Sequence, residues 1–158
     1  MAEERNRGKA IYDKLKIAQL PFKLKKEDIN EFGRDAAANF NFILEDVDRP
    51  ILKWCMSTIK KAKVFTLIYY ANENNLPIYK EDIAKKLTEY SYKTIATIVD
   101  EGVEKGYFVP MDPIHQNISD KKIKNIRPSE KLVVEFLNWS IERIKANDDL
   151  VKKYNKKI

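Results

Sequence analysis

The sequence is poor in the residues that build disulfide scaffolds, glycine-rich sheets and membrane spans. Its one cysteine, Cys55, excludes a disulfide within the chain, and its four glycines against 34% charged residues favour helices. No apolar stretch approaches the roughly 20 uncharged residues that cross a membrane. The first ten residues also lack the apolar segment of a secretory signal. The sequence therefore predicts a mostly α protein of the cytoplasm that has no membrane partner.

The sequence also has few of the residues that metal sites and active sites need. His115 is the only histidine, so neither a histidine pair nor the usual cysteine–histidine zinc cluster can be assembled within one chain. No glycine-rich phosphate loop is present, and the carboxylates show no pairing suited to acid–base catalysis. We therefore expect a protein without a metal or cofactor that is not an enzyme. We interpret Cys55 as a small buried apolar residue in preference to a redox sensor.

The charge balance is basic overall but nearly neutral in the region with the clearest motif. Thirty Lys and Arg against 24 Asp and Glu give a formal charge of +6, which favours an anionic partner. The chain is also rich in Lys, Asn and Ile, so general residue usage explains part of this excess equally well. Residues 80–127 hold nine basic and eight acidic residues, so a binding function depends on where the charges are placed.

The middle of the chain has a strong helical pattern. Residues 51–75 contain no Gly or Pro, and their apolar residues recur at steps of three and four. This pattern predicts a long helix that begins near Pro50, or two helices joined near residues 60–63. A turn near residue 76 and a short helix over residues 80–87 follow.

The most informative segment is residues 91–106, which have a helix signal at each end. Ser91 is a good N-cap, and Gly106 is a good residue to follow a helix. The apolar residues between them lie on one face of a helix, at Ile95, Ile98, Val99, Gly102 and Val103. The other face presents Tyr92, Lys93, Ala96 and Thr97 in its first turns. Such a helix suits entry into a DNA groove with its N-terminus first.

A hairpin and a last helix complete the pattern. Residues 107–109 and 123–127 have the composition of two strands joined by a long tip. A helix then opens at Pro128-Ser129-Glu130, and residues 148–158 form a helical extension of it or a frayed tail. Helix, short helix, capped helix, hairpin and helix is the order of a winged helix-turn-helix. We divide the chain into an N-terminal helical dimerisation region at 1–50, the winged helix-turn-helix at 51–127 and a C-terminal dimerisation helix with a basic tail at 128–158.

Two segments resemble the MarR-type transcriptional regulators. Residues 94–109, which run from Thr94-Ile95-Ala96-Thr97 to Tyr107-Phe108-Val109, resemble the reading helix and first wing strand of that family. Residues 120–131 resemble its second wing strand where it enters the dimerisation helix. The chain departs from the family at Gly102, where a large apolar residue is usual, at Tyr79, which is a poor cap for the second helix, and on the wing, which carries lysines where arginine is usual. The resemblance covers roughly residues 60–145 and implies a dimeric regulator that occupies an operator in double-stranded DNA.

The residues that we expect to contact DNA lie at the start of the second and third helices and on the wing. Hydroxyl and ammonium groups near a helix N-terminus are well placed for phosphates and base edges, and wing lysines for the backbone. The predicted DNA-binding set is Lys80, Ser91, Tyr92, Lys93, Thr94, Thr97, Lys121, Lys122 and Lys124. Solvated, solubilising surface is the alternative explanation for the same residues. A winged-helix module that binds protein within a larger assembly is the alternative function.

A stripe on the last helix predicts a homodimer. It is longer than the core of one wing and helix should need, and it comprises Leu132, Val133, Phe136, Leu137, Ile141 and Ile144. A small apolar effector is a further partner to consider, because Trp54, Phe65, Tyr69 and Trp139 could line a cleft beside the dimerisation helices. Core packing explains the same aromatic residues with fewer assumptions.

Overall fold

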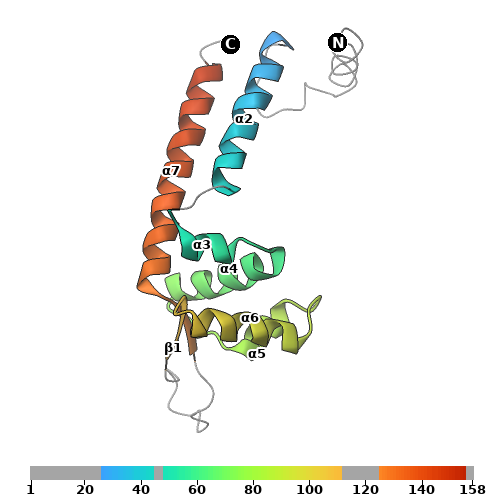
Figure 1. The fold of residues 1–158 in the computed structure, drawn as a ribbon, viewed down its shortest axis with the longest axis vertical. Helices are drawn as coiled ribbons and strands as arrows, with labels where there is room; N and C mark the ends of the chain where they lie inside the picture. The colour runs from blue at the N-terminus through green and yellow to red at the C-terminus, as the bar shows by residue number, and fades with distance from the viewer. Residues whose placement is uncertain (1–25, 45–47, 112–124, 156–158) are drawn as a thin grey trace. The chain divides into compact units, whose positions relative to one another are not determined.

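Helices dominate the fold. The structure, a computed structural model, describes residues 26–44, 48–111 and 125–155. The elements in chain order are η2 (Lys26–Asp28), α2 (Ile29–Leu44), α3 (Pro50–Cys55), α4 (Ile59–Glu73), α5 (Lys80–Lys86), α6 (Tyr92–Glu104), β1 (Phe108–Met111), β2 (Asn125–Pro128) and α7 (Glu130–Asn155) (Figure 1). No described helix is long and apolar enough to cross a membrane.

The chain divides into two compact units. The winged unit comprises Asp46–Ile141, and the helical unit comprises Met1–Glu45 together with Glu142–Ile158. Residues 130–141 of α7 thus belong to the winged unit, whereas the predicted division placed residues 128–158 in a region of their own.

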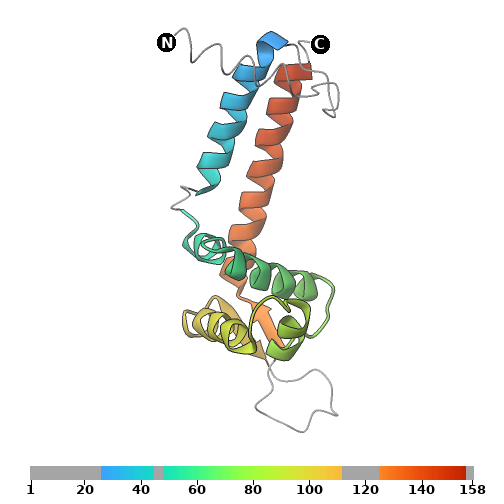
Figure 2. The ribbon, with the colours of Figure 1, turned by 90° about the vertical axis from the view of Figure 1, so that its right-hand side faces the viewer.

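The helical unit pairs α2 with the C-terminal part of α7 (Figure 2). The ring of Phe32 meets the buried ring of Tyr154 edge-on, with centroids 5.1 Å apart. The Tyr154 hydroxyl donates to Asp35 Oδ2 at 2.7 Å, and Lys153 Nζ lies 2.8 Å from Asp35 Oδ2 and 3.1 Å from Glu31 Oε1. Residues 148–155 continue helix α7. Of the two alternatives that the sequence allowed, a helical extension or a frayed tail, the structure therefore shows the helical extension for these residues.

A helix break separates α3 from α4 at residues 56–58, earlier than the expected junction near residues 60–63. The Ser57 hydroxyl donates to the Trp54 carbonyl at 2.7 Å, which satisfies one of the last carbonyls of α3. Thr58 then caps α4, because its hydroxyl accepts the Lys61 N–H at 3.2 Å. Two adjacent hydroxyl residues therefore end one helix and start the next.

Helices α5 and α6 form the helix-turn-helix. The Tyr79 N–H donates to Asp82 Oδ2 at 3.0 Å at the start of α5, and the Ser91 hydroxyl accepts the Thr94 N–H at 3.1 Å at the start of α6. Gly106 has a φ of +73° after the end of α6, and the Tyr107 N–H donates back to the Gly102 carbonyl at 2.8 Å. The predicted N-cap and the predicted glycine stop are both confirmed.

The wing strands β1 and β2 pair antiparallel, with Phe108 opposite Pro128 and Met111 opposite Asn125. The residue that follows the predicted turn, Ile78, also forms hydrogen bonds with β2. The Ile78 N–H donates to Asn125 Oδ1 at 3.0 Å, and the Ile126 N–H donates to the Ile78 carbonyl at 2.9 Å. Backbone before α5 is thereby anchored to β2, which ties the wing to the helix-turn-helix.

The core of the winged unit draws on every one of its elements. Fully buried side chains from α4, α5, α6, β1 and α7 include Val64, Ile68, Ile83, Ile95, Val99, Phe108 and Leu132. Gly102 is also buried, and a Cβ built on it would lie 2.3 Å from Cδ2 of Phe108. The Phe108 ring therefore occupies the space that a larger residue at position 102 would need. The observed order of elements confirms the predicted winged helix-turn-helix fold.

Candidate nucleic-acid interface

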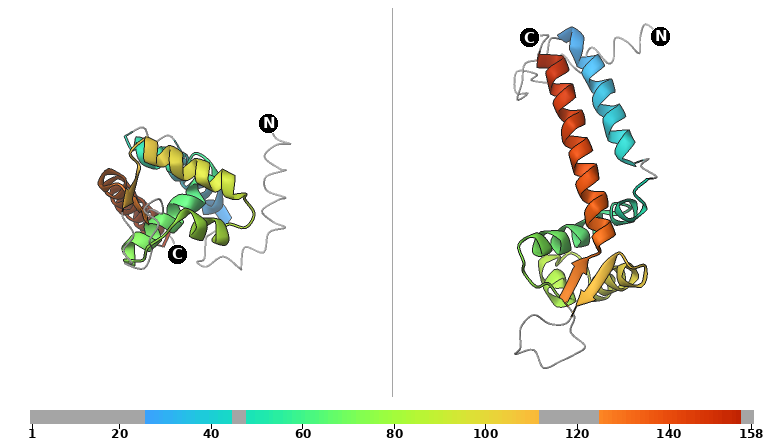
Figure 3. Two further views of the ribbon diagram at one scale, coloured as in Figure 1. Left: turned by 90° about the horizontal axis from the view of Figure 1, so that it is seen from below. Right: turned by 90° about the vertical axis from the view of Figure 1, so that its left-hand side faces the viewer.

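Helix α6 has one buried face and one exposed polar face in its first turns. Ile95, Ile98 and Val99 are buried, whereas Lys93, Thr97 and half of the Tyr92 surface are exposed. Figure 3 (left) looks onto the side of the winged unit where α6 lies. The periodicity of the sequence therefore assigned the two faces correctly.

Local hydrogen bonds determine which donor and acceptor groups of the exposed hydroxyls remain available to a ligand. The Thr97 hydroxyl donates to the Lys93 carbonyl at 2.8 Å, and the Ser91 and Thr94 hydroxyls lie 3.0 Å apart. Thr97 has thus used its donor, and it presents acceptor lone pairs and a methyl group. Those groups suit an amino group of adenine or cytosine, or a thymine methyl, in a major groove.

The Tyr92 and Lys80 side chains both contact acidic neighbours. The Tyr92 hydroxyl donates to Glu81 Oε1 at 3.3 Å, and the pKa of Tyr92 is raised by desolvation and by the Glu81 carboxylate. Lys80 forms an ion pair with Asp100. A predicted DNA-contacting cation on α5 is therefore already neutralised by α6, which makes Lys80 the weakest member of the predicted set.

A basic hollow adjoins the exposed face of α6. It has a volume of about 370 Å³, and it is lined by Thr58, Lys60, Lys61, Lys93, Thr94, Thr97 and Ile98. Lys93, Thr94 and Thr97 of this hollow belong to the predicted DNA-binding set, whereas Lys60 and Lys61 of α4 do not. Their position in the first turn after a Ser-Thr pair was the available signal, because it marks a new helix start at residue 59.

The wing lysines Lys121, Lys122 and Lys124 lie outside the described residues, as does His115. The described part of the wing carries one basic residue, Arg127, whose guanidinium donates to Asn72 Oδ1 at 3.0 Å. This contact holds Arg127 against α4.

The predicted dimerisation stripe separates into an inner and an outer set. Leu132 is fully buried in the winged unit, and Phe136 packs against Phe65 and Tyr69 with centroids 5.5 and 4.4 Å away. The spacing of these two residues places both on the inner face of α7, so they pack into the core of the chain. Val133 is half-buried. The outer set consists of Val134, Leu137, Ile141 and Ile144, which are 51%, 48%, 64% and 69% exposed. Val134 was missing from the predicted stripe.

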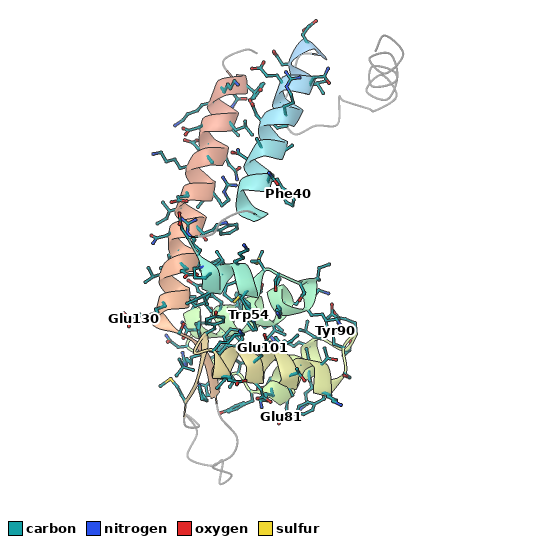
Figure 4. All side chains as sticks on the ribbon, viewed as in Figure 1. Phe40, Trp54, Glu81, Tyr90, Glu101 and Glu130 are labelled. Carbon is teal, nitrogen blue, oxygen red and sulfur yellow. The ribbon has the colours of Figure 1, made fainter. Side chains whose placement is uncertain are left out.

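The aromatic residues considered for an effector cleft pack against other rings. The Trp54 indole N–H donates to Glu101 Oε1 at 3.0 Å (Figure 4), and its ring meets those of Tyr107 and Phe108 at 5.4 and 5.9 Å. The rings of Phe65, Tyr69 and Trp139 all contact Phe136. The four residues thus belong to two separate aromatic clusters and do not line a common cleft. This arrangement favours core packing over an effector site as the explanation for them.

Cys55 is fully buried in the winged unit, and burial together with the nearby Glu135 carboxylate raises its pKa to about 12. A thiol in this state is a poor nucleophile at neutral pH. Within residues 26–44, 48–111 and 125–155, no three His, Cys, Asp or Glu side chains gather as a metal site would require.

The order of elements in the winged unit, with α5 and α6 followed by the two wing strands, places the protein in the winged helix-turn-helix class. No family model and no curated protein matches the chain. Among solved structures it is similar to a mutant of MepR from S. aureus, with 15% identity and a TM-score of 0.46 over 74% of this chain and 82% of that chain. It is also similar to the transcriptional regulator SlyA, with 21% identity and a TM-score of 0.38 over 79% of this chain and 76% of that chain.

Proposed function

We propose that the protein is a sequence-specific regulator of transcription that binds double-stranded DNA as a homodimer in the cytoplasm. One observation carries the proposal: α6 buries one face in the winged unit and leaves Tyr92, Lys93 and Thr97 exposed in its first turns. A helix held in this way can enter a major groove without unfolding any part of the core.

Each exposed residue of α6 has a distinct role in this proposal. Lys93 pairs with a backbone phosphate, and Thr97 and Tyr92 contact base edges. Ser91 and Thr94 hold the helix start in place through their hydrogen bonds. The wing lysines 121, 122 and 124 pair with the phosphates of the next groove.

The homodimer rests on the outer set of α7. Val134, Leu137, Ile141 and Ile144 follow one another at steps of three, four and three, which is the spacing of a helix–helix seam. An apolar row of this length is unusual on a free helix surface, and a second copy of α7 offers a matching row under a two-fold axis. Two reading helices related by this axis would then address two half-sites of an operator.

A second candidate function is a winged-helix module that binds protein. The near balance of nine basic and eight acidic residues over 80–127 favours it, and the ion pair between Lys80 and Asp100 removes one more free cation from the surface. The three lysines that line the hollow beside α6 favour DNA. Neither function requires an active site.

A titration of fluorescently labelled duplex DNA tests the proposal. Anisotropy should reveal binding to any duplex at about 50 mM salt, and log affinity should fall linearly with log salt. On a mapped operator, Thr97→Ala and Tyr92→Ala should reduce discrimination against random DNA, while Lys121→Ala and Lys122→Ala should weaken both nearly equally. Absence of binding at about 50 mM salt would leave the protein-binding module as the better explanation.

Light scattering tests the homodimer. Leu137→Asp or Ile141→Asp should shift the protein towards monomer and weaken operator binding together, because each places a charge in the seam. Lys145→Asp, also on exposed α7 surface but outside the outer set, is the control. A wild-type protein that is monomeric at micromolar concentration would contradict this part of the proposal.

A further inference from the structure

The hollow beside α6 brings together the first turns of two helices that are far apart in sequence. Thr58, Lys60 and Lys61 come from the start of α4, and Lys93, Thr94 and Thr97 come from the start of α6. The residue proposed to read bases, Thr97, therefore lines the same hollow as two lysines outside the helix-turn-helix.

The lysines of the hollow differ from other lysines of the winged unit in what lies beside them. Lys61 Nζ lies 4.7 Å from the centroid of the Trp54 ring, and Lys60 Nζ lies 5.6 Å from that of Tyr90. Lys63 Nζ also lies 5.6 Å from the Tyr90 centroid, but it has a carboxylate partner, Glu89 Oε1, at 2.7 Å, and Lys80 is paired with Asp100. An aromatic face orients an ammonium group without cancelling its charge, whereas a carboxylate cancels it.

Among the described residues, no carboxylate forms an ion pair with Lys60, Lys61 or Lys93. Three lysines from two helices thus line the hollow, and none of them is neutralised by a carboxylate of the described residues. The positive ends of both helix dipoles add to the same potential.

We propose that this hollow binds a phosphodiester of the DNA backbone, with Lys60 and Lys61 as its ligands from α4. The inference rests on the proposed DNA-binding function and extends it beyond the reading helix and the wing. A duplex whose bases meet Thr97 must place a backbone strand within a few ångströms of the major-groove edge, and the hollow is the basic surface that adjoins Thr97. The lysines of α4 would therefore set how deeply α6 enters the groove.

The test compares variants that remove one charge at a time and keep a polar, unbranched side chain that is one atom shorter than lysine. Lys60→Gln and Lys61→Gln remove the α4 ligands, and Lys93→Gln removes the α6 cation. Lys105→Gln is the matched control, because Lys105 is exposed at the opposite end of α6 and its loss changes the net charge equally. Affinity for a random duplex is measured by anisotropy over a range of salt concentrations, and thermal melting confirms that each variant is folded.

Each substitution in the hollow should lower the slope of log affinity against log salt by about 1, and Lys60→Gln with Lys61→Gln should lower it by about 2. Lys105→Gln should leave the slope at the wild-type value. On a mapped operator, a neutral methylphosphonate at the contacted position should weaken binding of the wild-type protein. The same change should leave binding of the double variant as it is on the unmodified operator.

The outcomes separate this inference from the function on which it rests. If the wild-type protein binds DNA and Lys93→Gln lowers the salt slope, while Lys60→Gln and Lys61→Gln behave like Lys105→Gln, then the α4 ligands are wrong and the DNA-binding function stands. If the wild-type protein binds no duplex at about 50 mM salt, both proposals fall.

Discussion

Replacing Gly102 with alanine tests whether α6 and the wing strand β1 form one packed body. Alanine is favoured over glycine inside a helix by about 1 kcal/mol, so helix propensity alone predicts stabilisation. The structure predicts the opposite, because the new Cβ would lie 2.3 Å from Cδ2 and 2.6 Å from Cε2 of Phe108. The Phe108 ring is itself buried, with the Trp54 ring 5.9 Å away, so it has little room to move.

The expected net effect of Gly102→Ala is a loss of up to about 2 kcal/mol in the free energy of unfolding. Overpacking a filled core costs about 1–3 kcal/mol, and the gain in helix propensity offsets about 1 kcal/mol of that cost. Urea unfolding followed by tryptophan fluorescence measures the free energy of unfolding, since Trp54 lies in the affected cluster. Gly33→Ala in α2 is the control, because a Cβ there meets nothing within 4 Å, and this change should stabilise its helix by roughly 0.5–1 kcal/mol.

A double-mutant cycle with Phe108→Leu identifies the cause of the loss. Without the ring, Gly102→Ala should be neutral or stabilising, which gives a coupling energy of about 0.5–3 kcal/mol between the two positions. If Gly102→Ala stabilises the otherwise unchanged protein by the full amount that propensity predicts, the close packing of α6 against β1 is refuted.

Two further predictions concern the other buried and charged groups. Cys55 is fully buried with its pKa raised to about 12, so a thiol reagent at pH 8 should label it only as fast as the protein opens, and denaturant should accelerate labelling; rapid labelling of the folded protein would contradict this. The pKa of Asp35 is held below its usual 3.8, first by Lys153 and then by Tyr154, so its contribution to the packing of α2 on α7 is present above pH 3.8 and is lost as the pH falls through the lowered value. Circular dichroism melts of wild type and Asp35→Asn should therefore differ near neutral pH and converge in acid, and an equal acid sensitivity of both proteins would show that Asp35 contributes nothing.

Much of the fold follows from local patterns in the sequence. Ser91 and Gly106 define the ends of α6 because capping and left-handed backbone depend on the residue itself and its nearest neighbours. The two faces of α6 follow from its apolar spacing for the same reason. Residues 1–50 were predicted as a helical region, but neither the bounds of α2 nor its packing against Tyr154, which lies over a hundred residues away, was predicted.

Contacts between distant segments were decided only by tertiary structure. The inner and outer sets of α7 share one amphipathic pattern, and only packing against Phe65 and Tyr69 assigns Phe136 to the core of the chain while Ile141 stays exposed. Charge compensation is equally nonlocal. Lys60 and Lys80 are both lysines at a helix start, but one lies over a neutral ring and the other beside Asp100. A sequence determines which side chains carry charge, whereas the free charge of a surface depends on which neighbours the fold places within a few ångströms.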